Sequence, residues 1–279
     1  MESTRQFALI VCVAVASSQA ACVVSAELEG DDDVVAEVQQ EVVVHNALTR
    51  NALTRNALTR NALTRNALTR NALTRNALMG NSFTSEALRD PESRELLSFI
   101  VSCALPEDES FKVEVGGKSY TFTGELGLAP EWGTRQGSCG ETCQEWVSAC
   151  LLARVNYRGE HVTISIRGQN EALSSTKRER ERYDVPEATY YGNVFLETQR
   201  RFACLAPGKR SIPRVCGDSL NNCVVDVVGD CRDVCDGPRA DGSFLHCSDS
   251  EPLLELPCGG RIFPPRTDRY KSSVTVFLE

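Results

Sequence analysis

The sequence predicts an α+β fold, in which a single disulfide-rich domain of short antiparallel strands with about two helices follows a repeat spacer. Two stretches with apolar residues at helical spacing lie among several short stretches that alternate apolar and polar residues, all within 86–279. Eleven of the thirteen cysteines also fall in this part of the chain. Its length is ordinary for one hydrophobic core.

The first 26 residues have the pattern of a secretory signal. The apolar stretch Phe7–Ala16 is followed by small residues, and Val24-Ser25-Ala26 supplies the small residues that signal peptidase needs before Glu27. In the alternative, residues 1–26 hold a lipoprotein signal that ends at Cys22, which would then carry a lipid. Either signal exports the chain to the periplasm, the outer-membrane surface or the extracellular space, with membrane contact only through an anchor at Cys22.

Residues 27–45 are an acidic spacer, and residues 46–85 are a repeat spacer in which Asn-Ala-Leu-Thr-Arg occurs six times in succession. The seven acidic residues of the first and the six arginines of the second nearly cancel, so the domain carries most of the net charge of −8. A period of five places the leucines on neither one helix stripe nor one strand face. An extended chain and a small solenoid both remain open, and the solenoid resembles the pentapeptide-repeat family, although Asn46 stands where that family has a small residue.

The order of elements in the domain, 86–279, begins with a helix. Asp90-Pro91-Glu92 has the pattern of a helix start, and the apolar face that follows ends near Cys103. Gly116-Gly117 lies between two alternating stretches and predicts a hairpin. The capping box Ser138-x-x-Glu141 predicts a second helix that runs through Arg154.

The second half of the domain is predicted to be richer in strands. Residues 174–185 form a charged run that we interpret as a solvated loop or short helix. The alternating or apolar stretches on either side predict strands at His161–Ile166, Tyr190–Leu196, Phe202–Leu205, Cys223–Val228 and Val274–Leu278.

Export makes the cysteines a disulfide framework. Cys143 and Cys150 are about 10 Å apart along one helix, so each needs a different partner. An odd cysteine remains, and we expect it to be Cys103, because a buried free thiol is stable at the end of an apolar helix face. The weaker alternative is zinc, with ligand spacing at Cys139-x₃-Cys143 and Cys231-x₃-Cys235. No cofactor and no metal are predicted.

Three stretches resemble uncharacterised exported cysteine-rich bacterial proteins with Asn-rich pentapeptide runs. These stretches are residues 127–132, 143–156 and 223–229. Residues 149–159 are also distantly similar to the ADYC domain, with Asn156 and Arg158 in place of its Asp and second Cys. The resemblance implies export and a similar domain layout, and it implies no activity.

Few residues have the pattern of a catalytic or binding site. The histidines of the domain are His161, at the start of a predicted strand, and His246, beside Cys247. Glu131 and Glu141 are candidate acids of a hydrolase, since carboxylates carry no motif of their own. Trp132 and Trp146 fit either the core or, with Glu131, a sugar-binding surface. The acidic cluster near Gly237, which we interpret as a solvated turn or a calcium site, comprises Asp230, Asp233, Asp236 and Asp241.

The net charge and the scarcity of catalytic motifs favour a protein that is not an enzyme. A net charge of −8 argues against nucleic-acid binding. We therefore expect a secreted or cell-envelope-associated binding or structural module, displayed on the repeat spacer, for an unknown cell-surface or extracellular ligand. The alternatives are a secreted hydrolase that uses carboxylates or a histidine, and a secreted inhibitor of hydrolases.

Overall fold

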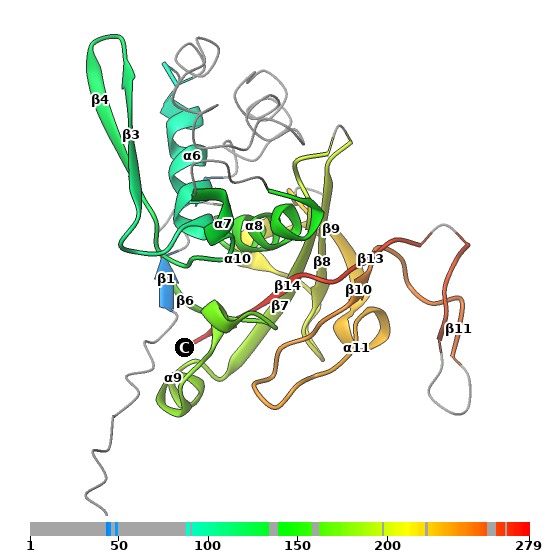
Figure 1. The fold of residues 1–279 in the computed structure, drawn as a ribbon. Coiled ribbons are helices and arrows are strands. Elements are labelled where there is room, and N and C mark those ends of the chain that lie inside the picture. The colour runs from blue at the N-terminus through cyan, green and yellow to red at the C-terminus, as the bar shows by residue number, and fades with distance from the viewer. Residues whose placement is uncertain are drawn as a thin grey trace, which may run out of the picture. The chain divides into compact units, whose positions relative to one another are not determined.

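The computed structural model describes residues 43–45, 48–49, 88–89, 91–133, 139–157, 162–196, 198–220, 223–255, 261–265 and 267–279. All of them belong to one compact unit (Figure 1). The predicted signal, most of both spacers, His161 and Cys258 lie outside the described residues. Among the described residues, no helix is both long and apolar enough to cross a membrane.

A six-stranded sheet organises the domain. Its order is β1-β6-β14-β7-β8-β9. Neighbouring strands are antiparallel except for β8 and β9, which are parallel, so the expectation of antiparallel strands holds for four of the five pairings. The strands are β1 (Val43–His45), β6 (Thr163–Arg167), β14 (Ser273–Leu278), β7 (Val185–Asn193), β8 (Arg200–Leu205) and β9 (Asp226–Asp230).

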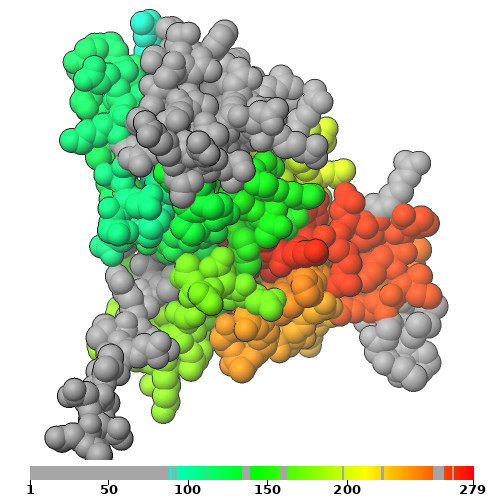
Figure 2. Space-filling model, in the orientation of Figure 1, coloured from blue at the N-terminus to red at the C-terminus, as the bar shows by residue number. Residues whose placement is uncertain are grey.

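Both faces of this sheet are covered. Side chains alternate along β7, so the ring of Tyr190 lies in the larger hydrophobic core with the main helices. Its neighbour Tyr191 packs in a second, smaller core with Phe202 and Tyr270. Figure 2 shows the C-terminal segments, in orange and red, gathered beside the green segments of the helical layer. The sheet is therefore the middle layer of three.

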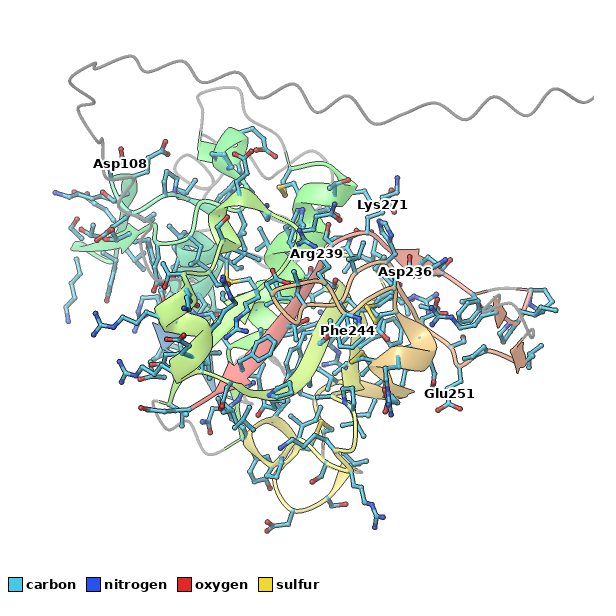
Figure 3. All side chains as sticks on the ribbon, turned by 90° about the horizontal axis from the view of Figure 1, so that it is seen from below. Asp108, Asp236, Arg239, Phe244, Glu251 and Lys271 are labelled. Atoms are coloured by element: carbon cyan, nitrogen blue, oxygen red, sulfur yellow. A yellow bond between two sulfur atoms is a disulfide. The ribbon has the colours of Figure 1, made fainter. Side chains whose placement is uncertain are left out.

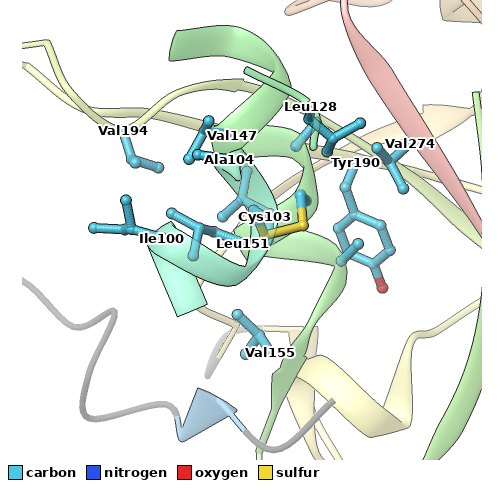
Figure 4. Close-up of a cluster of buried hydrophobic side chains, with 14 of the residues drawn as sticks. Ile100, Cys103, Ala104, Leu128, Val147, Leu151, Val155, Tyr190, Val194 and Val274 are labelled. Atoms are coloured by element: carbon cyan, nitrogen blue, oxygen red, sulfur yellow. A yellow bond between two sulfur atoms is a disulfide. The ribbon is translucent and has the colours of Figure 1, made fainter. Parts of the chain in front are cut away.

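Two helices of more than three turns form the first layer, as predicted. They are α6 (Pro91–Ala104) and α8 (Glu141–Ala153). Helix α8 packs on β7 and β14 and contacts α6. Ala149, Leu151 and Leu152 of α8 are completely buried. Figure 4 shows Leu151 and Val147 among core residues from α6 and the sheet.

The prediction that Cys103 is the odd cysteine is wrong. The last turn of α6 meets the last turns of α8, and Cys103 forms a disulfide with Cys150, with their Cα atoms 6.1 Å apart (Figure 4). The apolar environment that suits a free thiol suits a disulfide equally well. Ten of the eleven cysteines of the domain form the pairs 103–150, 139–143, 204–231, 216–223 and 235–247. This leaves Cys258 as the cysteine outside these pairs.

The start of α8 also differs from the prediction. The helix begins at Glu141, and its N-cap is Gly140, which makes no side-chain capping hydrogen bond. Ser138, which we expected to cap the helix, lies outside the described residues. A disulfide between Cys139 and Cys143 ties the preceding residue to the first turn instead. As predicted, Cys143 and Cys150 have different partners.

The predicted hairpin is confirmed. Strands β3 (Ser110–Val115) and β4 (Lys118–Thr123) pair in a register that places Val115 opposite Lys118. The two residues between them have φ values of 57° and 77°. Only glycine adopts two successive positive φ values without strain, so Gly116-Gly117 forms the tight turn.

The remaining elements are short. Among the described residues, the other helices are α7 (Pro130–Gly133), η1 (Glu171–Leu173), α9 (Lys177–Arg182), α10 (Pro213–Cys216) and α11 (Cys231–Val234). The short strands are β2 (Leu48–Thr49), β5 (Val155–Asn156), β10 (Cys247–Ser248), β11 (Leu254–Glu255), β12 (Arg261–Ile262) and β13 (Arg269–Tyr270). The structure is thus an α+β domain with five disulfides, and the charged run 174–185 contains α9.

Parts of the predicted spacers belong to the domain. Strand β1 pairs with β6 and forms an edge of the main sheet. Strand β2, from the first repeat, pairs in parallel with β5. On the other side of the repeats, Leu88 is completely buried. The chain therefore contacts the domain both before and after residues 50–87.

The Cys103–Cys150 bridge is expected to be a major contributor to stability. It closes a separation of 47 residues between two core helices, for which chain entropy gives roughly 4 kcal/mol. The double variant Cys103→Ala/Cys150→Ala should lower the free energy of unfolding by about that amount in a denaturant titration. The control Cys139→Ala/Cys143→Ala opens a separation of only four residues and should cost roughly 2 kcal/mol. Equal losses would contradict this account.

Candidate functional site

A pocket of about 270 Å³ lies where the chain leaves α8. Residues from four parts of the fold line it: β5 and the residue after it, the residue before β6, α10 with the turn after it, and β14. Its walls are mostly apolar. The lining includes Asn156, Tyr157, Val162, Pro213, Asp218 and Leu278.

A buried ion pair stands at the inner side of the pocket. Arg214 Nε donates to Glu187 Oε1 at 3.0 Å, and the side chains are only 6% and 5% exposed. The same guanidinium donates to the carbonyls of Ala153 at 2.9 Å and Val155 at 2.6 Å. Arg214 thus ties α10 to β7 and to the end of α8, and it fixes the pocket on the rigid part of the fold.

The charges of this pair compensate each other. Burial, the largest single cause, lowers the pKa of Arg214, but the charge of Glu187, the electrostatic effect of Tyr190 and the hydrogen bond to Glu187 together outweigh burial, so the pKa is raised overall. The hydroxyl of Tyr190 donates to Glu187 at 3.1 Å. Burial, and then the Glu187 charge, raise the pKa of Tyr190 well above its ordinary value. Arg214 therefore stays charged, and its charge is balanced within the protein.

The outer part of the pocket is apolar and carries one acid. Tyr157 and Val162 are each 36% exposed, and Asp218 is exposed at the rim. Gly217 has a φ of 65°, and a Cβ atom there would lie 2.9 Å from the Tyr157 ring. This position therefore needs glycine, which lets the ring lie directly over the turn.

Size and chemistry restrict what the pocket can hold. Small-molecule sites are usually about 300–1,000 Å³, so this pocket lies below that range. It suits a small ligand or one side chain of a macromolecule rather than a nucleotide cofactor. Since Glu187 balances Arg214, Asp218 gives the lining a net negative charge. The complementary group has an apolar body and a cationic end.

The carboxylates and tryptophans singled out from the sequence lie elsewhere. Glu131 is exposed on α7 and Glu141 is exposed on α8, and neither lines the pocket. Trp132 is buried and Trp146 is half-buried against the core, which agrees with a core role for both. His161 lies outside the described residues.

His246 contacts the carboxylate of Asp236, which the sequence analysis assigned to the acidic cluster near Gly237. Its Nδ1 atom is 3.1 Å from Asp236 Oδ2, and both side chains are 44% exposed. Asp236, labelled in Figure 3, also accepts a hydrogen bond from Arg269 at 3.1 Å. Arg261 lies 3.6 Å from the same carboxylate. Through Asp236, the ion pairs of this surface cluster join the segments around Asp236, His246 and Arg261–Arg269.

The predicted acidic cluster does not converge. Asp230 caps α11 and accepts from Arg232 at 2.8 Å. The Arg232 guanidinium lowers the pKa of Asp230. Asp241 accepts from the hydroxyl of Ser243 at 2.7 Å. Protein donors thus occupy these carboxylates separately, as expected of polar turns.

The zinc alternative is not supported by the cysteine pairing. Cys139 and Cys143 are bonded to each other. Cys231 is bonded to Cys204, and Cys235 is bonded to Cys247. Within the described residues, the one group of three candidate metal ligands is Cys204, Cys231 and Cys235, and all three sulfurs are in disulfides.

Glu145 is a buried acid that sequence reasoning missed. It lies on α8, is 8% exposed and accepts from the backbone N–H of Ser272 at 3.3 Å. Burial raises its pKa, and the charge of Glu141 one turn earlier adds to the rise. The helical pattern could have placed it on the buried side, because Ala149 and Leu152 follow it by four and seven residues and so lie on the same face.

No family model, curated protein or solved structure matches this chain.

Burial of Glu145 predicts a pH-dependent cost. The folded state disfavours its charged form, so the cost is absent below the ordinary carboxyl pKa, grows as the pH rises from that value to the raised one, and is constant above it. We expect Glu145→Gln to raise the denaturant midpoint at pH 7 and to change it little at pH 4. Glu141→Gln, at an exposed position on the same helix, is the control. A loss of stability at pH 7 would refute the assignment.

The Arg214–Glu187 pair should be necessary for the fold around the pocket. Arg214→Met leaves a buried carboxylate without its partner, which costs about 3–5 kcal/mol. The double variant Arg214→Met/Glu187→Leu should recover much of that loss in chemical denaturation, because it removes the unpaired charge. Arg232→Met, which breaks the solvent-exposed pair with Asp230, should have little effect. If the double variant were no more stable than the single one, the pair would not explain the loss.

Proposed function

We propose that the chain is an exported binding module, secreted or associated with the cell envelope, whose domain takes up an extracellular or cell-surface ligand in the pocket beside Tyr157. Five disulfides fit an oxidising compartment. The predicted signal, or a lipid on Cys22, would deliver the chain there. In this proposal the acidic residues after the signal link it to the domain, and the repeats lie between two segments of the chain that both contact the domain.

The observation that carries this proposal is an apolar pocket with an acid at its rim on a rigid support. Tyr157, Val162 and Leu278 offer apolar surface, and Asp218 offers a charge. The buried Arg214–Glu187 pair and the Cys216–Cys223 disulfide hold the α10 side of the pocket. A preformed site of this kind binds without the cost of ordering its walls.

A hydrolase would need a base or a carboxylate pair in a cleft. None of the candidate catalytic acids and histidines that the structure describes lines the pocket. The acid that lines it is Asp218.

One observation favours the inhibitor alternative. Leu253 is 69% exposed and Ile262 is 46% exposed, and they are joined by a backbone hydrogen bond of 2.7 Å next to the β11–β12 pair. A hydrolase inhibitor could present such a surface.

Phenethylamine is a suitable probe, because it combines an apolar ring with a cation. We expect it to shift the amide resonances of Tyr157, Val162 and Gly217 in ¹H–¹⁵N spectra more strongly than neutral phenethyl alcohol does. Asp218→Asn should weaken amine binding by about two- to fivefold, as for an exposed ion pair, and leave the alcohol unaffected. Glu141→Gln is the control. Shifts that avoid the pocket residues, or equal binding by Asp218→Asn, would refute the proposed site.

A further inference from the structure

Four cysteines gather in the second hydrophobic core, on the sheet face opposite α8. They are Cys204 in β8, Cys231 at the start of α11, Cys235 just after α11 and Cys247 in β10. Each is completely buried. They form two separate disulfides, 204–231 and 235–247. Figure 3 labels Phe244, another residue of this core, close to α11.

The two disulfides touch each other. Cys204 Sγ lies 3.4 Å from Cys235 Sγ. Both sulfurs are already in disulfides and carry no hydrogen, so this is a non-bonded contact between sulfur atoms. The sulfurs of Cys204, Cys231 and Cys235 all lie within 4.8 Å of one another. Cys235 is therefore in contact with a sulfur that is not its present partner.

We propose that these four cysteines form one internal thiol–disulfide exchange site, in which Cys235 can be bonded to Cys247 or to Cys204. A dithiol, such as that of a thiol oxidoreductase, first reduces the Cys235–Cys247 bond with two electrons and two protons and is itself oxidised to a disulfide. The Cys235 thiolate then attacks Cys204 Sγ. The Cys204–Cys235 bond forms, the Cys204–Cys231 bond breaks, and its electron pair leaves on Cys231 Sγ, which takes up a proton.

The backbone around Cys235 is held independently of its disulfide. Arg261 donates to the carbonyl of Cys235 at 2.9 Å and to those of Arg232 at 3.0 Å and Asp233 at 2.6 Å. These bonds keep the end of α11 in place when the bond to Cys247 opens. Cys235 then remains beside Cys204, which is fixed in β8 between two neighbouring strands.

The partner segment contains a residue in an uncommon backbone conformation. His246, just before Cys247, has a φ of 49°, a left-handed conformation that is unfavourable for a residue with a Cβ atom. The contact of its ring with Asp236 holds it there. Of the two thiols that opening the Cys235–Cys247 bond gives, that of Cys235 belongs to the group of three sulfurs within 4.8 Å of one another, so Cys235 is placed to attack. The half-exposed side chains of Asp236 and His246 lie next to Cys235 and Cys247 in the sequence.

Variants of the full mature chain in which one cysteine is replaced by serine test the proposal without any added reductant. Cys247→Ser leaves the Cys235 thiol in contact with the Cys204–Cys231 bond. After acid quenching, alkylation and tryptic digestion, we expect the linked peptides Cys204–Cys235 and Cys204–Cys231 in amounts within about tenfold of each other, since similar disulfides exchange with equilibrium constants near one. Cleavage after Arg232 separates Cys231 from Cys235, so the two products are distinguishable. Cys231 should be alkylated in the same proportion as the new bond forms.

Cys235→Ser is the matched control, because it removes the same disulfide but leaves the thiol of Cys247. It should give no linkage between Cys204 and the tryptic peptide 240–261, which holds Cys247. The proposal is overturned if Cys247→Ser retains only the Cys204–Cys231 bond. It is also overturned if both variants rearrange equally, since that would indicate scrambling in unfolded chains.

The wild-type chain supplies a second measurement that needs no variant. Limited dithiothreitol at pH 8, followed by acid quenching, should give a two-electron-reduced species in which some molecules carry thiols on Cys231 and Cys247 together. This pair of thiols arises only if Cys235 has moved to Cys204. Partly reduced species that show thiols on Cys235 and Cys247 alone, with no Cys204–Cys235 peptide, would overturn the proposal.

Discussion

The packing of α8 against the sheet is the constraint on which the rest of the structure depends. This helix is buried on nearly every side, with β7 and β14 beneath it and α6 beside it. One disulfide ties its first turn to Cys139, two residues before the helix begins, and another ties its last turns to α6. The carbonyl of Ala153 at its end accepts from Arg214, which orients α10. The walls of the pocket therefore take their positions from α8.

The sequence predicted the long elements of the fold well, for reasons that are local. Helices α6 and α8 and the β3–β4 hairpin follow from periodicity and from turn residues that are contiguous in the chain. The start of α8 differs from the prediction, since Gly140 is the N-cap and a disulfide joins Cys139 to Cys143 in the first turn. The parallel pairing of β8 with β9, and that of β2 with β5, depend on distant segments that no local pattern reveals.

The cysteine framework and the pocket were less predictable than the helices. Spacing showed that Cys143 and Cys150 need different partners, but the pairing of Cys103 depends on how two helices cross. The pocket gathers residues from β5, α10 and β14, and none of them forms a motif. Glu179 shows the same limit: it lies in a charged run typical of solvent, yet it is completely buried and accepts from Ser165 Oγ at 2.6 Å. Charge alone does not report tertiary burial.

The attachment of the chain on both sides of the repeats has a consequence for how the gene can vary. Strands β1 and β2 precede residues 50–87, and the buried Leu88 follows them, so these residues connect two points of one body. For a flexible connection, closure entropy costs only about 0.6 kcal/mol for each doubling of length. Each copy of Asn-Ala-Leu-Thr-Arg corresponds to fifteen nucleotides, a multiple of the codon length. A change in the number of copies therefore keeps the reading frame and leaves the pairing of β1 and β2 with the domain unchanged.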